Sequence, residues 1–247
     1  MLAIARTFTL AAALFGGSGP LVADEINAQF NVSISGFPVG KVSYEGEADD
    51  SSYKIQGFMG STGFFGLFIG TRYSGAAIGS FRGDLPAPEV FRGRFEQRRQ
   101  FAQVDIRYNN GLPISVERIP PRPAQPFDAT AADARNHVDP ISALYHLLRE
   151  RPQSELCTQS FGIFEGSRTG SIQLSRATVD SNGEPLVGRV ICNGVYRRDA
   201  GFSPEQLAER NEFPFTITFI PTEGDLHVAQ EFLAVTEFGL AKAVRRN

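Results

Sequence analysis

The sequence predicts a mainly β protein: a strongly curved antiparallel sheet that forms an incomplete barrel or β-spiral and is covered by one or two short helices. Three observations support this fold class. Apolar and polar residues alternate over most of the chain, turn signals recur every ~8–12 residues, and glycines interrupt several strands. Interior glycines usually mark bends or close approach, and a sheet that curls around its own core needs such bends.

The predicted strands share one pattern. From Ile26 to Ile34 every second residue is apolar, as a half-buried strand requires. Turn-forming segments separate further runs of this kind, which stop at a proline-rich stretch and resume after Cys157. The predicted strand segments are 41–48, 52–59, 66–81, 88–99, 100–108, 112–119, 161–166, 171–180, 187–197, 213–221 and 227–244.

A connector and a helix divide the strands into two sets. The proline connector at 120–126 cannot lie in a central strand. The helix predicted at 139–150 begins with Asp139 as cap and ends before Pro152, and a second short capped helix is expected at 203–210. Only the sheet is available to bury the longer helix, so residues 24–247 are predicted to form one domain. A division into two domains at 120–138 is the alternative.

Residues 1–23 have the pattern of a cleaved signal peptide. Arg6 precedes an apolar run, a Gly/Ser/Pro break follows, and Val22-Ala23 ends the segment. Leu21 stands where a small residue is preferred, so the cleavage site is fixed only to within a few positions. An uncleaved anchor is the alternative, but the apolar run is shorter than the ~20 residues of a membrane span. The sequence therefore predicts an exported protein.

The chain contains two cysteines, Cys157 and Cys192. In an exported chain this even count predicts a disulfide between them. Two free thiols or a metal pair are the alternatives. A metal site is disfavoured because no histidine lies near either cysteine and no C-x-x-C spacing occurs.

Composition and motifs argue against several function classes. A net charge of -3 disfavours a nucleic-acid partner. No G-x-S-x-G motif occurs after the signal, and His137, His146 and His227 lack metal-ligand spacing. We therefore predict neither catalysis nor a cofactor or metal. An active site assembled from residues far apart in sequence is the remaining alternative.

The stretch GSTGFFGLFIG at 60–70 carries the main functional expectation. It is too short for a transmembrane helix, so it is either a core strand or the wall of a cavity for a hydrophobic ligand. We expect the helix to act as a lid on the concave face, held by apolar contacts alone, some of which an acyl chain could replace. The predicted ligand-binding residues are Phe64, Phe65, Leu67, Phe68 and Ile69 from this stretch, with Ile141, Leu144, Leu147 and Leu148 from the helix.

Arg92 and Arg94 share one face of a predicted strand. They could form a rim that contacts anionic head groups or an acidic partner. The alternative is a solvated sheet face on which Glu96 balances their charge.

Several segments in the same order resemble a known family. They are VGKVSYEG at 39–46, STGFFGLF at 61–68, DPISAL at 139–144, a cysteine before FEG at 164–166, and VICNGVYRRDAGF at 190–202. The chain resembles an uncharacterised family of exported proteobacterial proteins known only as a domain of unknown function. The resemblance implies a periplasmic β-rich fold, similar in outline to the incomplete barrels of outer-membrane lipoprotein carriers, which hold acyl chains between a curved sheet and helices. It implies no catalytic residues.

We therefore predict a monomeric, periplasmic, non-catalytic protein that binds a lipid or a lipoprotein acyl chain in the concave face of its sheet. One alternative is a structural or interaction protein that supports the cell envelope through protein contacts, without a ligand. The other is an enzyme that acts on envelope glycans or lipids, which would need two convergent carboxylates or an activated serine.

Overall fold

The computed structural model describes residues 24–62, 70–98, 100–180 and 183–246. These residues are mostly strand, as the alternation predicts. The strands before the connector are β1 Asp24–Ile34, β2 Phe37–Ala48, β3 Ser52–Ser61, β4 Thr71–Arg82, β5 Leu85–Gln97, β6 Gln100–Asn109 and β7 Leu112–Ile119. Those after it are β8 Arg151–Pro152, β9 Ser160–Phe164, β10 Thr169–Arg176, β11 Val190–Arg198, β12 Glu212–Pro221, β13 Leu226–Thr236 and β14 Gly239–Arg245.

The strands form a single sheet in the order β7-β6-β5-β4-β3-β2-β1-β14-β13-β12-β11-β10-β9, with β8 attached to β13. Strands adjacent in the sheet pair antiparallel. The two sets of strands are joined where β1 pairs with β14, with Phe30 opposite Arg245. Within the described residues, the terminal strands β7 and β9 do not pair with each other. The prediction of a curved, incompletely closed antiparallel sheet is therefore confirmed.

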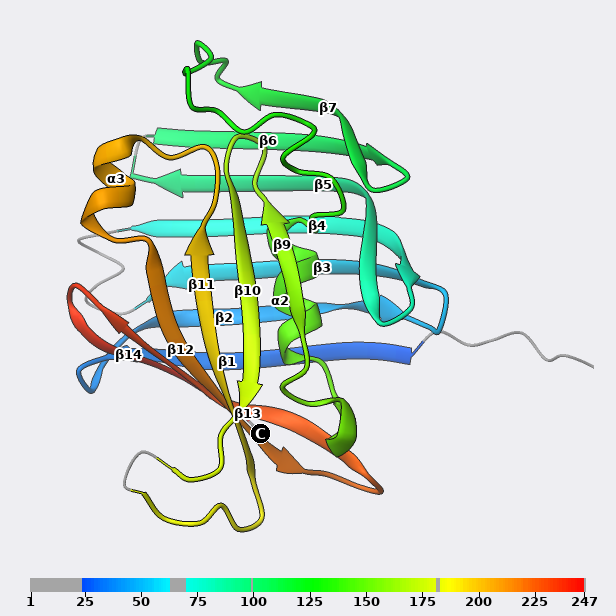
Figure 1. Cartoon of the computed structure of the whole chain (residues 1–247), viewed down its shortest axis with the longest axis vertical. Coiled ribbons are helices and arrows are strands. Elements are labelled where there is room, and N and C mark those ends of the chain that lie inside the picture. Colours follow the sequence, from blue (N-terminus) through cyan, green and yellow to red (C-terminus); the bar gives the residue numbers. More distant parts are fainter. Residues whose placement is uncertain (1–23, 63–69, 99, 181–182, 247) are drawn as a thin grey trace, which may run out of the picture.

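The sheet bends back so that its two halves face each other. In Figure 1 the strands β2–β7 run across the view, and β9–β12 cross in front of them at a steep angle. The helix α2, Pro140–Leu148, lies between the two layers. The core between the layers includes Phe30, Ile55, Phe91 and Ile106 from the first half and Phe164, Ile217 and Phe219 from the second.

A row of glycines allows α2 to approach the sheet closely. Gly57 on β3 pairs with Gly75 on β4, which pairs with Gly93 on β5. A Cβ atom at Gly57 would lie 2.6 Å from Ile141 Cδ1, and one at Gly75 would lie 2.7 Å from Ile141 Cγ1. The side chain of Ile141 therefore occupies the space that two ordinary side chains would fill, so these glycines serve close approach.

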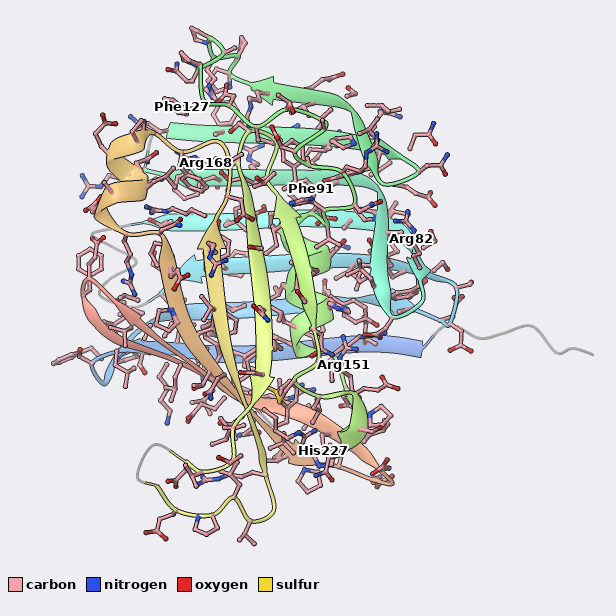
Figure 2. All side chains as sticks on the ribbon, viewed as in Figure 1. Arg82, Phe91, Phe127, Arg151, Arg168 and His227 are labelled. Carbon is pink, nitrogen blue, oxygen red and sulfur yellow. A yellow bond between two sulfur atoms is a disulfide. The ribbon has the colours of Figure 1, made fainter. Side chains whose placement is uncertain are left out.

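The segment between the proline connector and α2 bridges the open side of the sheet. Val138 accepts a hydrogen bond from Phe164 N (2.8 Å) and donates one to Gly162 O (2.9 Å), so it lies along the free edge of β9. Asn136 N donates to Gly111 O (2.6 Å) in the β6–β7 turn and its side chain accepts from Arg82. Figure 2 labels Arg82 beside this region. A non-strand segment thus links the β6–β7 turn to the free edge of β9.

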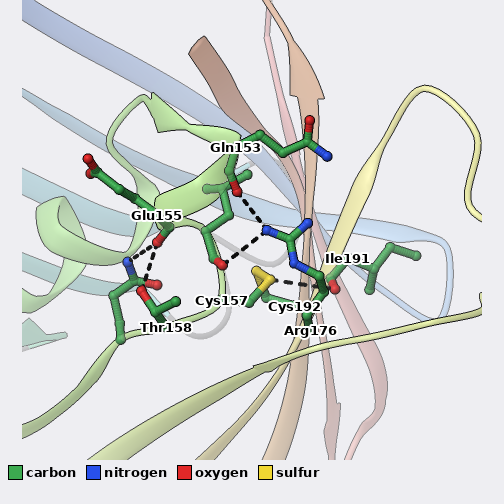
Figure 3. The surroundings of a disulfide bond; sticks show 9 residues. Gln153, Glu155, Cys157, Thr158, Arg176, Ile191 and Cys192 are labelled. Carbon is green, nitrogen blue, oxygen red and sulfur yellow. Dashed lines mark hydrogen bonds between the residues drawn. A yellow bond between two sulfur atoms is a disulfide. The ribbon is translucent and has the colours of Figure 1, made fainter. Parts of the chain in front are cut away.

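The predicted disulfide between Cys157 and Cys192 is present, with a Cα–Cα distance of 5.1 Å (Figure 3). Cys157 follows the 3-10 turn η1, Gln153–Glu155, and Cys192 lies fully buried in β11. Arg176 Nη2 donates to Gln153 O at 2.6 Å. The disulfide therefore ties the segment after α2 to the second half of the sheet.

One expected strand is divided in the structure, and the second helix forms as expected. The stretch 227–244, expected as one strand, forms β13 and β14 with a turn at Thr236–Gly239, where Gly239 has φ 112°. The second helix, α3, is Pro204–Glu209, capped by Ser203.

Candidate functional site

An apolar chamber lies inside one end of the incomplete barrel. It consists of two adjoining hollows. The first, about 490 Å³, lies between α2 and the strands β10–β13. The second, about 690 Å³, lies against β1–β3, β13 and β14. Both are lined by Ile34, Phe232 and Phe238, so these residues form the common wall. We call the two hollows together the apolar chamber.

Small residues at inward-facing strand positions leave this space open. Phe232 on β13 pairs with Ala243 on β14, and Ala243 pairs with Val32 on β1. In the next inward row, Ala234 pairs with Ala241, which pairs with Ile34. Three alanines thus occupy positions where larger side chains would fill the chamber. Volumes of this size fall within the range of ligand pockets.

The open end of the chamber carries exposed hydrophobic side chains. Phe238 is 78%, Phe37 65% and Met59 50% exposed, and all three line the second hollow. Large apolar groups gathered at an opening are typical of a site for a hydrophobic partner. The charged ends of Lys41 and Lys242 lie outside, because strand alternation directs them away from Val42 and Ala243, and Lys242 pairs with Glu231.

Hydrogen bonds and ion pairs hold both ends of α2. At its start, Asp139 Oδ1 accepts from Ile141 N and Ser142 N, both at 2.9 Å. The hydroxyl of Ser142 lies 2.8 Å from that of Tyr53 on β3. At its end, Tyr44 on β2 donates to Leu148 O at 3.2 Å.

Just beyond the helix, Arg149 and Arg151 both pair with Asp84 in the β4–β5 turn. The guanidinium of Arg151 also donates to His146 Nδ1 at 3.0 Å, and its side chain is 2% exposed. Burial and the nearby Arg151 charge lower the pKa of His146 to about 3. The expectation of a lid held by apolar contacts alone is therefore wrong: α2 is a fixed wall inside the barrel. A ligand would lie beside it.

The predicted lid residues divide between two faces of α2. Ile141 is buried against Gly57 and Gly75 of the first half of the sheet, and Leu148 is buried in the core. Leu144 and Leu147 are only partly buried, and Leu147 lines the first hollow. The structure therefore brings only Leu147 of the four to the chamber wall.

Of the other predicted site residues, the structure describes only Arg92 and Arg94. Phe64, Phe65, Leu67, Phe68 and Ile69 lie outside the described residues. The residues next to their segment, Ser61 and Thr71, line the second hollow. Arg92 donates two hydrogen bonds of 2.8 Å to Asp105 and Arg94 one of 2.6 Å to Glu96, all on the convex face of the sheet and away from the chamber.

The sequence reading missed the aromatic residues of the second half. Phe213, Phe215, Phe232 and Phe238 all line the first hollow. The sequence does contain a pattern that points to them: in β12 and β13, phenylalanines recur at the inward-facing positions of strands in which apolar and polar residues alternate. Sequence alone gave no reason to separate them from ordinary core residues.

The described residues lack two features. They contain no group of three metal-ligating side chains that could hold an ion. No helix among them has the length and apolarity needed to cross a membrane.

Comparisons with known proteins give a family and a distant structural likeness. A family model described as "Protein of unknown function (DUF3108)" matches residues 29–182, more than half of the chain. No curated protein matches the chain. A crystal structure of a beta-barrel-like protein of domain of unknown function DUF1849 from Brucella abortus is similar, with a TM-score of 0.43 and 7% identity over 92% of this chain and 97% of that one.

Proposed function

The chain belongs to the DUF3108 family of proteins of unknown function, and from this premise we propose that it is an exported, non-catalytic protein that binds a hydrophobic envelope ligand, such as a lipid or a lipoprotein acyl chain. The family assignment agrees with the expected membership of an uncharacterised domain family. The ligand lies in the apolar chamber on the concave side of the sheet.

The observation that carries the proposal is the chamber itself. Two hollows of about 490 and 690 Å³ adjoin within one end of the sheet, and their walls are almost entirely apolar. Each methylene buried there contributes about 0.8 kcal/mol, so an acyl chain gains enough to bind even after it loses conformational freedom. Exposed phenylalanines at the opening give such a chain an entry.

Export to the periplasm is part of the same proposal. The N-terminal pattern of residues 1–23 and the disulfide between Cys157 and Cys192 support it, because disulfides persist in oxidising compartments.

The test has two parts: recovery of a ligand bound to the purified protein, and substitutions that fill the chamber with a larger side chain. Mature protein purified from a periplasm is analysed by native mass spectrometry and lipid extraction, and delipidated protein is titrated with a fluorescent fatty-acid analogue. We expect Ala234→Phe and Ala241→Phe to lower the affinity for the analogue about tenfold or more. The matched control Ala76→Phe adds the same side chain to the exposed convex face and should leave the affinity unchanged.

Absence of any copurifying amphiphile, together with no rise in Tm on adding amphiphiles, would refute the proposal, because a ligand that binds the native state must stabilise it.

A second candidate is a structural protein that binds envelope proteins without a small ligand. The edge strand β7 favours it, because Ile114 and Ile119 on this strand are 61% and 49% exposed and an unpaired edge can accept a partner strand. A chamber that stays empty in the test above, with an envelope protein crosslinked to β7, would favour this candidate.

A further inference from the structure

Arginines and phenylalanines stack at the wall of the first hollow. The guanidinium of Arg210 lies 4.5 Å from the ring centroid of Phe213, and that of Arg198 lies 4.8 Å from the same ring. Arg198 and Arg168 then approach Phe202 at 5.1 and 5.2 Å. Arg210 and Phe213 both line the hollow, so the stack reaches the chamber through Arg210.

The two arginines nearest the chamber lack carboxylate partners among the described residues. Arg198 Nη1 donates to Gln206 O and Arg210 O, both at 2.8 Å. Arg210 donates through Nε to Glu212 O at 3.0 Å and through Nη2 to Val235 O at 3.4 Å. All four acceptors are neutral carbonyls, so neither positive charge is neutralised.

The acidic groups nearby do not remove this charge. The carboxylate of Glu212 is held by Arg197, with distances of 3.0 and 2.6 Å. Glu237 lines the same hollow as Arg210 but forms no ion pair with it within the described residues. The apolar chamber therefore has one cation in its wall, Arg210, and a second, Arg198, stacked on the same phenylalanine but outside the lining.

We propose that Arg210 binds the oxyanion of an amphiphile, a carboxylate or phosphate head group, whose hydrocarbon chain occupies the chamber. This inference rests on the proposed function and narrows its ligand to anionic amphiphiles. A guanidinium presents paired N–H donors to carboxylate or phosphate oxygens, and the ring of Phe213 holds it in place through a cation–π contact. Arg198, which contacts the same ring, adds to the positive electrostatic potential at this site.

Glu237 weakens the same site. Its negative charge lies at the wall that the head group must approach, so it lowers the local potential felt by an oxyanion. Removal of this charge should therefore tighten binding of anionic ligands and leave neutral ones unaffected.

The experiment compares ligands that differ only in the head group. Delipidated full-length mature protein is titrated with lysophosphatidylglycerol, a fatty acid and an uncharged monoacylglycerol, all with the same acyl chain. We expect lysophosphatidylglycerol to bind about tenfold more tightly than the monoacylglycerol at low salt, a difference that shrinks as salt screens the charge. The fatty acid shows whether a carboxylate suffices.

Three variants test the residues. Arg210→Gln should abolish the preference for the anionic head group, Arg210→Lys should keep part of it, and Glu237→Gln should increase it. The matched control is Arg72→Gln, because Arg72 also stacks on a phenylalanine, at 5.8 Å from the Phe58 centroid, but lies outside the chamber. Circular dichroism and Tm verify that each variant folds.

The outcomes separate the two proposals. Equal affinity for lysophosphatidylglycerol and the uncharged monoacylglycerol in wild type, or an unchanged preference in a folded Arg210→Gln, overturns the head-group site but leaves the proposed function standing. Binding of none of the three amphiphiles overturns both.

Discussion

The contact between Ile141 and the glycine row gives a quantitative prediction for Gly57→Ala. A Cβ at position 57 would lie 2.6 Å from Ile141 Cδ1, far closer than van der Waals contact, whereas the other two near atoms of Ile141 are at 3.7 Å. Overpacking of this kind costs about 1–3 kcal/mol. Restriction of the unfolded chain by alanine offsets about 0.4–1 kcal/mol. We expect a net loss of about 0.5–2 kcal/mol in the free energy of unfolding.

The substitution Ile141→Val removes only the clashing Cδ1 atom. By itself it costs about 0.5–1.5 kcal/mol. In the double variant the clash is absent, so the loss should be smaller than the sum of the single losses by about 1 kcal/mol. Gly75→Ala is the matched control, since its Cβ would lie 2.7 Å from Ile141 Cγ1, an atom that valine retains. Its coupling to Ile141→Val should be much weaker.

Urea unfolding with the disulfide intact measures the free energy of unfolding of each single and double variant in this double-mutant cycle. Additive losses for Gly57→Ala and Ile141→Val, or equal coupling at Gly57 and Gly75, would show that α2 does not rest on the glycine row as described.

Three further predictions concern stability. Burial raises the pKa of Asp139 to about 6, so the folded state keeps a proton that the unfolded chain releases near pH 4. This group's contribution to the free energy of unfolding therefore falls by up to about 3 kcal/mol as pH rises from about 4 to 6. Asp139→Asn keeps the oxygen acceptor of the cap, so the free energy of unfolding, measured with urea at each pH, should depend less on pH over that range. An unchanged pH dependence in this variant contradicts the prediction. Asp84→Asn should lower the free energy of unfolding by about 2–3 kcal/mol, less than the ~3–5 kcal/mol of a fully buried pair because Asp84 is half-exposed. The double substitution Cys157→Ser and Cys192→Ser should cost about 3–4 kcal/mol in the same assay, given a sequence separation of 35 residues, and a loss below 1 kcal/mol would contradict the entropic account.

The sequence predicted the strands well because burial on one side of a sheet imposes a period of two. The turn at Thr236–Gly239 was missed because Gly239 is its only strong turn residue. The capped start of α2 was predictable from Asp139 and Pro140, which act locally. Its position between two layers was not, because a single apolar stripe cannot reveal that both sides of a helix are covered.

The chamber was only partly predictable for a related reason. A hollow arises where small residues from different strands fall in one row, as Ala234 and Ala241 do. Their register depends on a turn that local sequence did not identify. Likewise, the approach of Arg210 and Arg198 to Phe213 depends on contacts across three elements. Glycines in strands did signal close approach, but not which side chain would use the space.

The pairing of β1 with β14 has a consequence for the order in which the sheet forms. These strands come from opposite extremes of the sequence, with Asn31 opposite Val244, and long-range pairings of this kind form slowly. Because synthesis proceeds from the N-terminus, β1 is made long before β14, so the seam between the two halves forms only after β14 is available. Loss of the β13–β14 hairpin would remove the wall that both halves share, so completion of the fold depends on that hairpin.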